Sequence, residues 1–177
     1  MATMTLNSAP KQRSDSQHDR TDVRSGKYLT FQLEREEFGI QVLQVREIMG
    51  LQEVTVVPHT PAHVKGVINL RGKVIPVICL RSKFGLPSAE YDSRTCIIVV
   101  QVQTEASRPL IGMVVDAVSE VLTITANEIE DTPDFGSGGS VPYILGMAKI
   151  KDKVKILIDI NKVVSANEVL SIDGLAA

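Results

Sequence analysis

The chain contains an internal repeat, and a repeated unit predicts two similar substructures. Residues 38–48 read FGIQVLQVREI and residues 111–121 read IGMVVDAVSEV. Residues 66–80 read GVINLRGKVIPVICL and residues 146–160 read GMAKIKDKVKILIDI. The identical positions are Gly39/Gly112, Val42/Val115, Val45/Val118, Glu47/Glu120, Gly66/Gly146, Lys73/Lys153, Val74/Val154 and Ile78/Ile158. Because both blocks recur in the same order, the fold has to accommodate two copies of one unit.

The two copies differ at one turn, and that difference bears on function. The first copy reads Asn69-Leu70-Arg71-Gly72, whereas the second reads Lys149-Ile150-Lys151-Asp152. A function that belongs to one copy only is therefore expected near the first of these turns.

Composition favours a β-rich protein without a nucleic-acid surface. The 177 residues suffice for one compact domain or two small fused ones, and 44% of them are hydrophobic. Aromatic residues make up only 4%, so Val and Ile build the core, as is typical of strands. A net charge of −2 predicts no nucleic-acid partner. Cys79 and Cys96 lie in apolar runs and are expected to be buried thiols.

No leader and no apolar run of about 20 residues is present, so we expect a cytoplasmic protein that does not insert into the membrane. The polar residues 1–26 are expected to form a disordered tail. Residues 131–142, rich in Gly, Ser and Pro, are expected to form a mobile loop.

Alternating and apolar runs predict many short strands separated by turns. The strands are expected at 28–33, 38–42, 53–57, 67–70, 74–80, 95–102, 110–115, 143–148 and 154–160. Short helical turns are expected at 45–50 and 81–86, and a weak helix at 161–170. Strand 74–80 is apolar on both faces, so both faces should be covered, and Pro76 within it predicts an edge or a bulge. With the repeat, this pattern favours two small antiparallel barrels that share a buried seam.

No motif frames an enzyme or a metal site, and no cofactor is expected. His59 and His63 stand four residues apart, but Pro61 lies between them and no further ligand is near in sequence. The segment Gly136-Ser137-Gly138-Gly139 lacks the Lys-Ser/Thr of a phosphate loop. Asp116 and Asp159 could be a carboxylate pair, but capping and turn roles are more common for such residues.

Two features instead point to a protein interface. Arg71 is expected at a hairpin tip, where Gly72 permits the positive φ of a tight turn. The segment Val45-Arg46-Glu47-Ile48 places a carboxylate between two apolar residues. Apolar anchors beside an arginine and a glutamate suit a protein interface better than a reaction, although solvated or core roles remain open for each.

These same residues resemble the CheW coupling proteins of bacterial chemotaxis. The resemblance covers about residues 27–170, and its most specific element is GVINLRGKVIPVICLR at residues 66–81. It implies two SH3-like, five-stranded antiparallel β-barrels packed together, roughly residues 27–90 and 91–160 with strand exchange possible, and a C-terminal tail at 171–177. It also implies a non-catalytic adaptor that links the cytoplasmic tip of chemoreceptors to the regulatory domain of the histidine kinase CheA, with no small-molecule substrate.

The resemblance also carries site residues. Matches to the segments that contact receptor or kinase in the family are Val45, Glu47, Ile48, Asn69, Arg71 and, in a Pro-x-Phe element, Phe135. Gly66 and Gly72 are expected to serve backbone geometry.

Three alternatives stay open at this point. The chain could couple receptor and kinase in a pathway other than chemotaxis. It could be a small-barrel nucleic-acid binder, which would require exposed aromatic residues and a basic face. It could be a cysteine-dependent enzyme, which would require a reactive Cys79 or Cys96.

Overall fold

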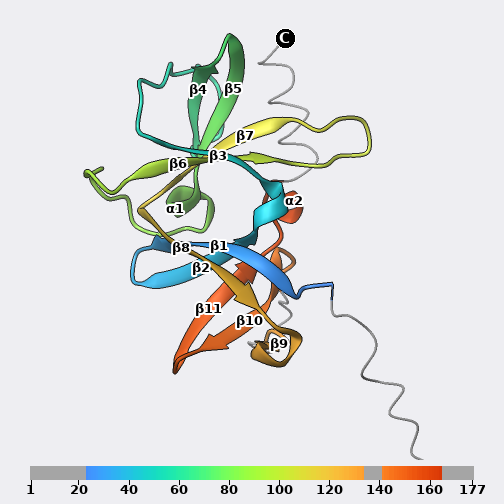
Figure 1. The fold of residues 1–177 in the computed structure, drawn as a ribbon. Helices are drawn as coiled ribbons and strands as arrows, with labels where there is room; N and C mark the ends of the chain where they lie inside the picture. Colours follow the sequence, from blue (N-terminus) through green and yellow to red (C-terminus); the bar gives the residue numbers. More distant parts are fainter. Residues whose placement is uncertain (1–22, 134–140, 165–177) are drawn as a thin grey trace, which may run out of the picture.

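The computed structural model describes residues 23–133 and 141–164, in which eleven strands form two sheets (Figure 1). The strands are β1 Gly26–Leu33, β2 Glu36–Gln41, β3 Val45–Gly50, β4 Val64–Leu70, β5 Lys73–Cys79, β6 Cys96–Gln101, β7 Leu110–Val115, β8 Ala117–Ile124, β9 Ile129–Glu130, β10 Ile144–Ile150 and β11 Lys153–Ile158. Short helices follow both long hairpins: α1 is Leu80–Lys83 and α2 is Ile160–Val163. No helix in these ranges is long and apolar enough to cross a membrane.

The sequence repeat is a repeat of topology. One sheet has the order β3-β6-β7-β5-β4 and the other β8-β1-β2-β11-β10-β9. Strands β1 to β5 of the first copy correspond to β6, β7, β8, β10 and β11 of the second. Thr55 forms one bridge to Val67 at the edge of β4, and β9 occupies the same place beside β10. The two sheets are therefore related by a pseudo-twofold arrangement.

Each sheet takes strands from both halves of the chain. Strands β6 and β7 lie between β3 and β5, while β1 and β2 lie between β8 and β11. This exchange of strand pairs between the two halves of the chain creates one parallel pair in each sheet, β5 with β7 and β2 with β11. Residues 27–90 and 91–160 thus contribute to both barrels, and neither range forms a separate body.

The core follows from this exchange. The largest cluster lies between the two sheets and includes Phe31, Ile78, Ile98 and Met113. Each sheet also has its own smaller apolar cluster on its other face. Stacked rings of Phe38, Phe84 and Tyr143 cross the seam, with centroids 5.6 and 4.9 Å apart. Burying this seam holds the two sheets together.

Strand β5 behaves as its sequence predicts. Ile78 enters the cluster between the sheets and Val77 the cluster on the other face, so both faces are covered. Pro76 pairs with Val67 of β4, and the pairing with β7 begins only at Val77. The missing amide hydrogen of Pro76 therefore falls where β5 has no second neighbour.

The mainly β, two-sheet SH3-like arrangement is confirmed, with differences in detail. Neither sheet closes into a hydrogen-bonded ring, and the sheet with β9 has six strands instead of five. The helical turn predicted at 45–50 is wrong, because these residues form β3 and the helical turn is the 3-10 segment Val42–Gln44. Side-chain burial along β3 alternates, which is the period of a strand.

Two further predictions were incomplete. The strand expected at 53–57 is reduced to the single bridge at Thr55, because β4 offers it a partner at only one position. Strand β8 was not predicted, since the polar Ser119 and Glu120 interrupt its apolar residues. Of the expected tail, residues 1–22 lie outside the described residues, whereas Arg24 donates a hydrogen bond to Asp131 at 2.8 Å and Gly26 begins β1.

Candidate functional site

The turn between β4 and β5 holds Arg71 in a fixed direction. Both central residues have positive φ, 52° at Arg71 and 84° at Gly72, which is the geometry of a two-residue hairpin. The amide of Gly72 donates to Oδ1 of Asn69 at 2.8 Å. Sequence reasoning expected positive φ only at the glycine, so the left-handed conformation of Arg71 is an addition. Asn69 closes the turn, which gives it a structural role at this position.

The second copy shows that the hairpin imposes this backbone. Lys151 and Asp152, in the equivalent turn between β10 and β11, have φ of 50° and 63°. The same conformation in both copies points to the fold as its cause. What distinguishes the first turn is therefore the side chain that it presents, the arginine.

Arg71 pairs with Glu47 of β3, which is remote in sequence. Its Nη2 lies 3.0 Å from Glu47 Oε1, and the side chains are 79% and 28% exposed. The pair joins the hairpin to β3, the opposite edge strand of the same sheet. The exposed pair is worth at most about 1 kcal/mol of stability. It leaves both charges accessible to a partner.

The apolar residues of β3 divide by face. Ile48 points outward and is 45% exposed, whereas Val45 is partly buried against the cluster between the sheets. Val74, which pairs with Asn69 across the hairpin, is also exposed, and the sequence analysis did not single it out. We call Glu47, Ile48, Asn69, Arg71 and Val74 the β3–hairpin site.

Gly66 of β4 has no room for a side chain. A Cβ on Gly66 would lie 2.0 Å from the carbonyl oxygen of Thr55, and its φ is 144°. Gly72 has open space around it, so only its φ of 84° requires glycine. Phe135, the remaining predicted contact residue, lies outside the described residues.

The two carboxylates considered as a possible pair, Asp116 and Asp159, each make a structural contact instead. Asp116 does not face Asp159. It accepts hydrogen bonds from Nε and Nη2 of Arg81 at 2.7 and 2.6 Å, and Asp159 caps α2 by accepting from the Asn161 amide. The described residues contain no cluster of three or more His, Cys, Asp or Glu side chains that could hold a metal ion. Burial raises the pKa of the Cys96 thiol, which disfavours the reactive thiolate.

The Arg81–Asp116 pair predicts an acid-sensitive contribution to stability. Burial disfavours the charged Asp116, but hydrogen bonds from Arg81 and from the Glu34 amide outweigh this and lower its pKa. The contribution is therefore present above the unfolded-state pKa of about 3.9 and is lost as the pH falls through the lower folded-state value. We expect Asp116→Asn to cost on the order of 1.5–3 kcal/mol at pH 7.

Thermal melts of Asp116→Asn and the unsubstituted chain from pH 7 to pH 2 check this expectation. The difference in melting temperature should shrink toward the acid end. A difference that stays constant over the whole range would contradict the assignment of Asp116 as the charged partner.

Comparison with known proteins gives one consistent family. A family model described as a CheW-like domain matches residues 27–168. Chemotaxis protein CheW of Klebsiella aerogenes is 39% identical over 84% of this chain and 87% of its own length. Chemotaxis protein CheW of Rhizobium meliloti is 36% identical over 79% and 88%. The crystal structure of the scaffolding protein TtCheW from Thermoanaerobacter tengcongensis, 33% identical, superposes with a TM-score of 0.70 over 81% of this chain and 95% of that one.

Proposed function

The chain belongs to the CheW-like family and is a non-catalytic chemotaxis adaptor, and from this premise we propose that it binds both the cytoplasmic tip of chemoreceptors and the regulatory domain of the histidine kinase CheA. The observation that carries the proposal is the β3–hairpin site. It combines the Arg71–Glu47 ion pair, which joins β3 to the tip of a hairpin of fixed backbone, with exposed apolar side chains at Ile48 on β3 and Val74 on β5.

This chemistry suits recognition of a protein. Interfaces use exposed apolar anchors together with arginine, and they gain specificity from charges at their rim. Arg71 can leave Glu47 and form an ion pair with an acidic residue of the partner. Alternatively, the Arg71–Glu47 pair stays intact and contacts partner residues of complementary charge. Val45 anchors β3, the strand that carries Glu47 and Ile48, by packing against the core between the sheets. Asn69 supports it by closing the turn.

We further propose that the protein acts in the cytoplasm, where it is recruited to membrane-associated receptor arrays. Phe135 would add a contact with the kinase. The identity of the kinase that the chain retains will assign its receptors and its pathway.

A reconstitution experiment tests the proposal. Membranes that contain the receptor, purified kinase and the full chain are mixed and sedimented. We expect the kinase to sediment with the membranes when the chain is present, and to a much smaller extent when it is absent. Equal sedimentation with and without a folded chain would contradict the coupling function.

A further inference from the structure

The interiors of the two barrels differ in chemistry although their strands are equivalent. In the sheet of β3 to β7, Ile75 and Val99 are buried in an apolar cluster and Leu110 packs against it. The strand registers and the repeat place Lys155, Thr30 and Glu37 at the equivalent positions of the other sheet. Lys155 and Thr30 are buried too, so one barrel has a polar interior where the other is apolar.

Lys155 is the centre of this polar interior. Its side chain is only 7% exposed and forms an ion pair with Glu37, while Glu120 Oε1 lies 4.0 Å from its Nζ. Among the described residues the one hydrogen bond of its ammonium group is the one donated to Glu37. A lysine ammonium has three donors, so Lys155 retains capacity to donate to another acceptor.

A pocket of about 240 Å³ opens onto Lys155. Its walls come from β2, β8, β10 and β11 and from the turn between the last two. The lining residues are Glu37, Glu120, Leu122, Ile150, Lys151, Lys153 and Lys155. Three lysines against two glutamates leave an excess of one positive charge. Among the described residues Lys151 and Lys153 form no ion pair.

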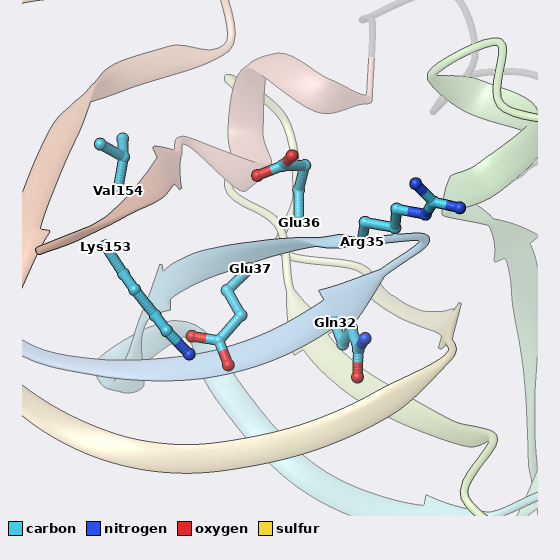
Figure 2. Close-up of a pocket in the computed structure, with 6 residues that line it drawn as sticks. All are labelled: Gln32, Arg35, Glu36, Glu37, Lys153 and Val154. Atoms are coloured by element: carbon cyan, nitrogen blue, oxygen red, sulfur yellow. The ribbon is translucent and has the colours of Figure 1, made fainter.

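A second pocket adjoins the pocket at Lys155. It has a volume of about 310 Å³ and shares Glu37 and Lys153 with the first. Figure 2 shows its side chains, which come from the hairpin between β1 and β2 and from the start of β11. Lys155 does not line this second pocket, so the buried ammonium serves the first alone.

We propose that the pocket at Lys155 binds a carboxylate, supplied by an aspartate or glutamate side chain of a protein partner. Lys155 donates to the carboxylate from the floor of the pocket and Lys151 approaches it from the turn. Leu122 and Ile150 give apolar walls for the methylene groups of the incoming side chain. Charge-assisted hydrogen bonds of this kind are stronger than neutral ones.

Charge and size favour this occupant. A phosphate dianion would bring two negative charges toward Glu37 and Glu120. The lining has an excess of one positive charge, which one carboxylate neutralises. The pocket is smaller than the roughly 300–1,000 Å³ of typical small-molecule sites. That the carboxylate comes from a partner protein rests on the proposed adaptor function. That the pocket binds a carboxylate does not depend on that function.

The first test uses N-acetyl-L-glutamate α-N-methylamide as the probe, in which the side-chain carboxylate is the one charge, and N-acetyl-L-glutamine α-N-methylamide as its neutral control. Both are titrated into the full chain while the methyl resonances of Leu122 and Ile150 are followed by NMR. We expect saturable shifts with the acid and none with the amide. Lys155→Met should weaken binding about tenfold or more, since it removes a hydrogen bond to a charged group.

Lys149→Met is the matched control, because Lys149 pairs with Glu130 and does not line the pocket. It should bind the acid as well as the unsubstituted chain. Methionine at position 155 should fold, since the equivalent residue in the other barrel is Ile75, and a thermal melt verifies this. Equal shifts with both probes, or unchanged affinity in a folded Lys155→Met, would overturn the carboxylate site.

The second test identifies the source of the carboxylate. Binding to the kinase regulatory domain and to a receptor-tip fragment is measured for the unsubstituted chain and Lys155→Met. We expect a loss of about tenfold for one partner, and competition by the same N-acetyl-L-glutamate α-N-methylamide. If the acid binds the pocket but both partner affinities are unchanged, the protein source is wrong. If the unsubstituted chain binds neither partner, the adaptor function fails while the carboxylate site stands.

Discussion

Replacing Gly66 with aspartate should unfold the chain or lower its melting temperature severely. A Cβ at this position would lie 2.0 Å from the Thr55 oxygen and 2.7 Å from its carbonyl carbon, both backbone atoms. The φ of 144° adds strain for any residue with a side chain. The Thr55 bridge to Val67 must then break, and together these effects should cost more than about 3 kcal/mol.

Circular dichroism melts of Gly66→Asp measure this loss. Gly50→Ala is the control, because Gly50 lies in β3 and a Cβ there would meet nothing within 4 Å. It should melt within a few degrees of the unsubstituted chain. A Gly66→Asp variant of normal stability that fails to bind partners would instead make Gly66 a contact residue.

Arg71→Ala and Glu47→Ala should abolish most partner binding while leaving the fold intact. The exposed ion pair contributes at most about 1 kcal/mol to stability, so melting temperatures should change little. Removing one charge leaves the other without its partner in a desolvated contact, which typically costs on the order of 2–5 kcal/mol. The expected loss of affinity is about thirtyfold or more.

The double variant sharpens this prediction. If Arg71 and Glu47 act as one unit, removing both should weaken binding by less than the sum of the two single losses. Lys151→Ala, in the equivalent turn, should have a much smaller effect on the partners of the β3–hairpin site. Unchanged affinity of both single variants for receptor and kinase would contradict the assignment, and a large drop in melting temperature would indicate a structural pair.

Much of the fold follows from local patterns. Alternation and apolar runs located β1, β2, β6 and β7, and the Asn-Leu-Arg-Gly turn located the hairpin of β4 and β5. A segment without such a pattern was missed, because Ser119 and Glu120 interrupt the apolar residues of β8. The exchange of strands is a long-range property, and it was expected as possible only through the resemblance to a known family.

The candidate site shows the same division. Single-residue features identified Glu47, Ile48 and Arg71, because each stands out from its neighbours in the sequence. The pairing of Arg71 with Glu47 depends on the curl of a whole sheet, which brings its two edge strands together. The polar interior around Lys155 was also missed, since the repeat was read for identities and Lys155 is a difference between the copies.

Calorimetric titration of the full chain measures whether it holds receptor and kinase at the same time. The kinase regulatory domain and the receptor-tip fragment are each titrated into the chain, and each is then titrated into the chain saturated with the other. We expect saturable binding of both and a complex that contains all three components. A folded chain that binds neither, or that releases one partner when the other saturates, would contradict its role as a coupling adaptor.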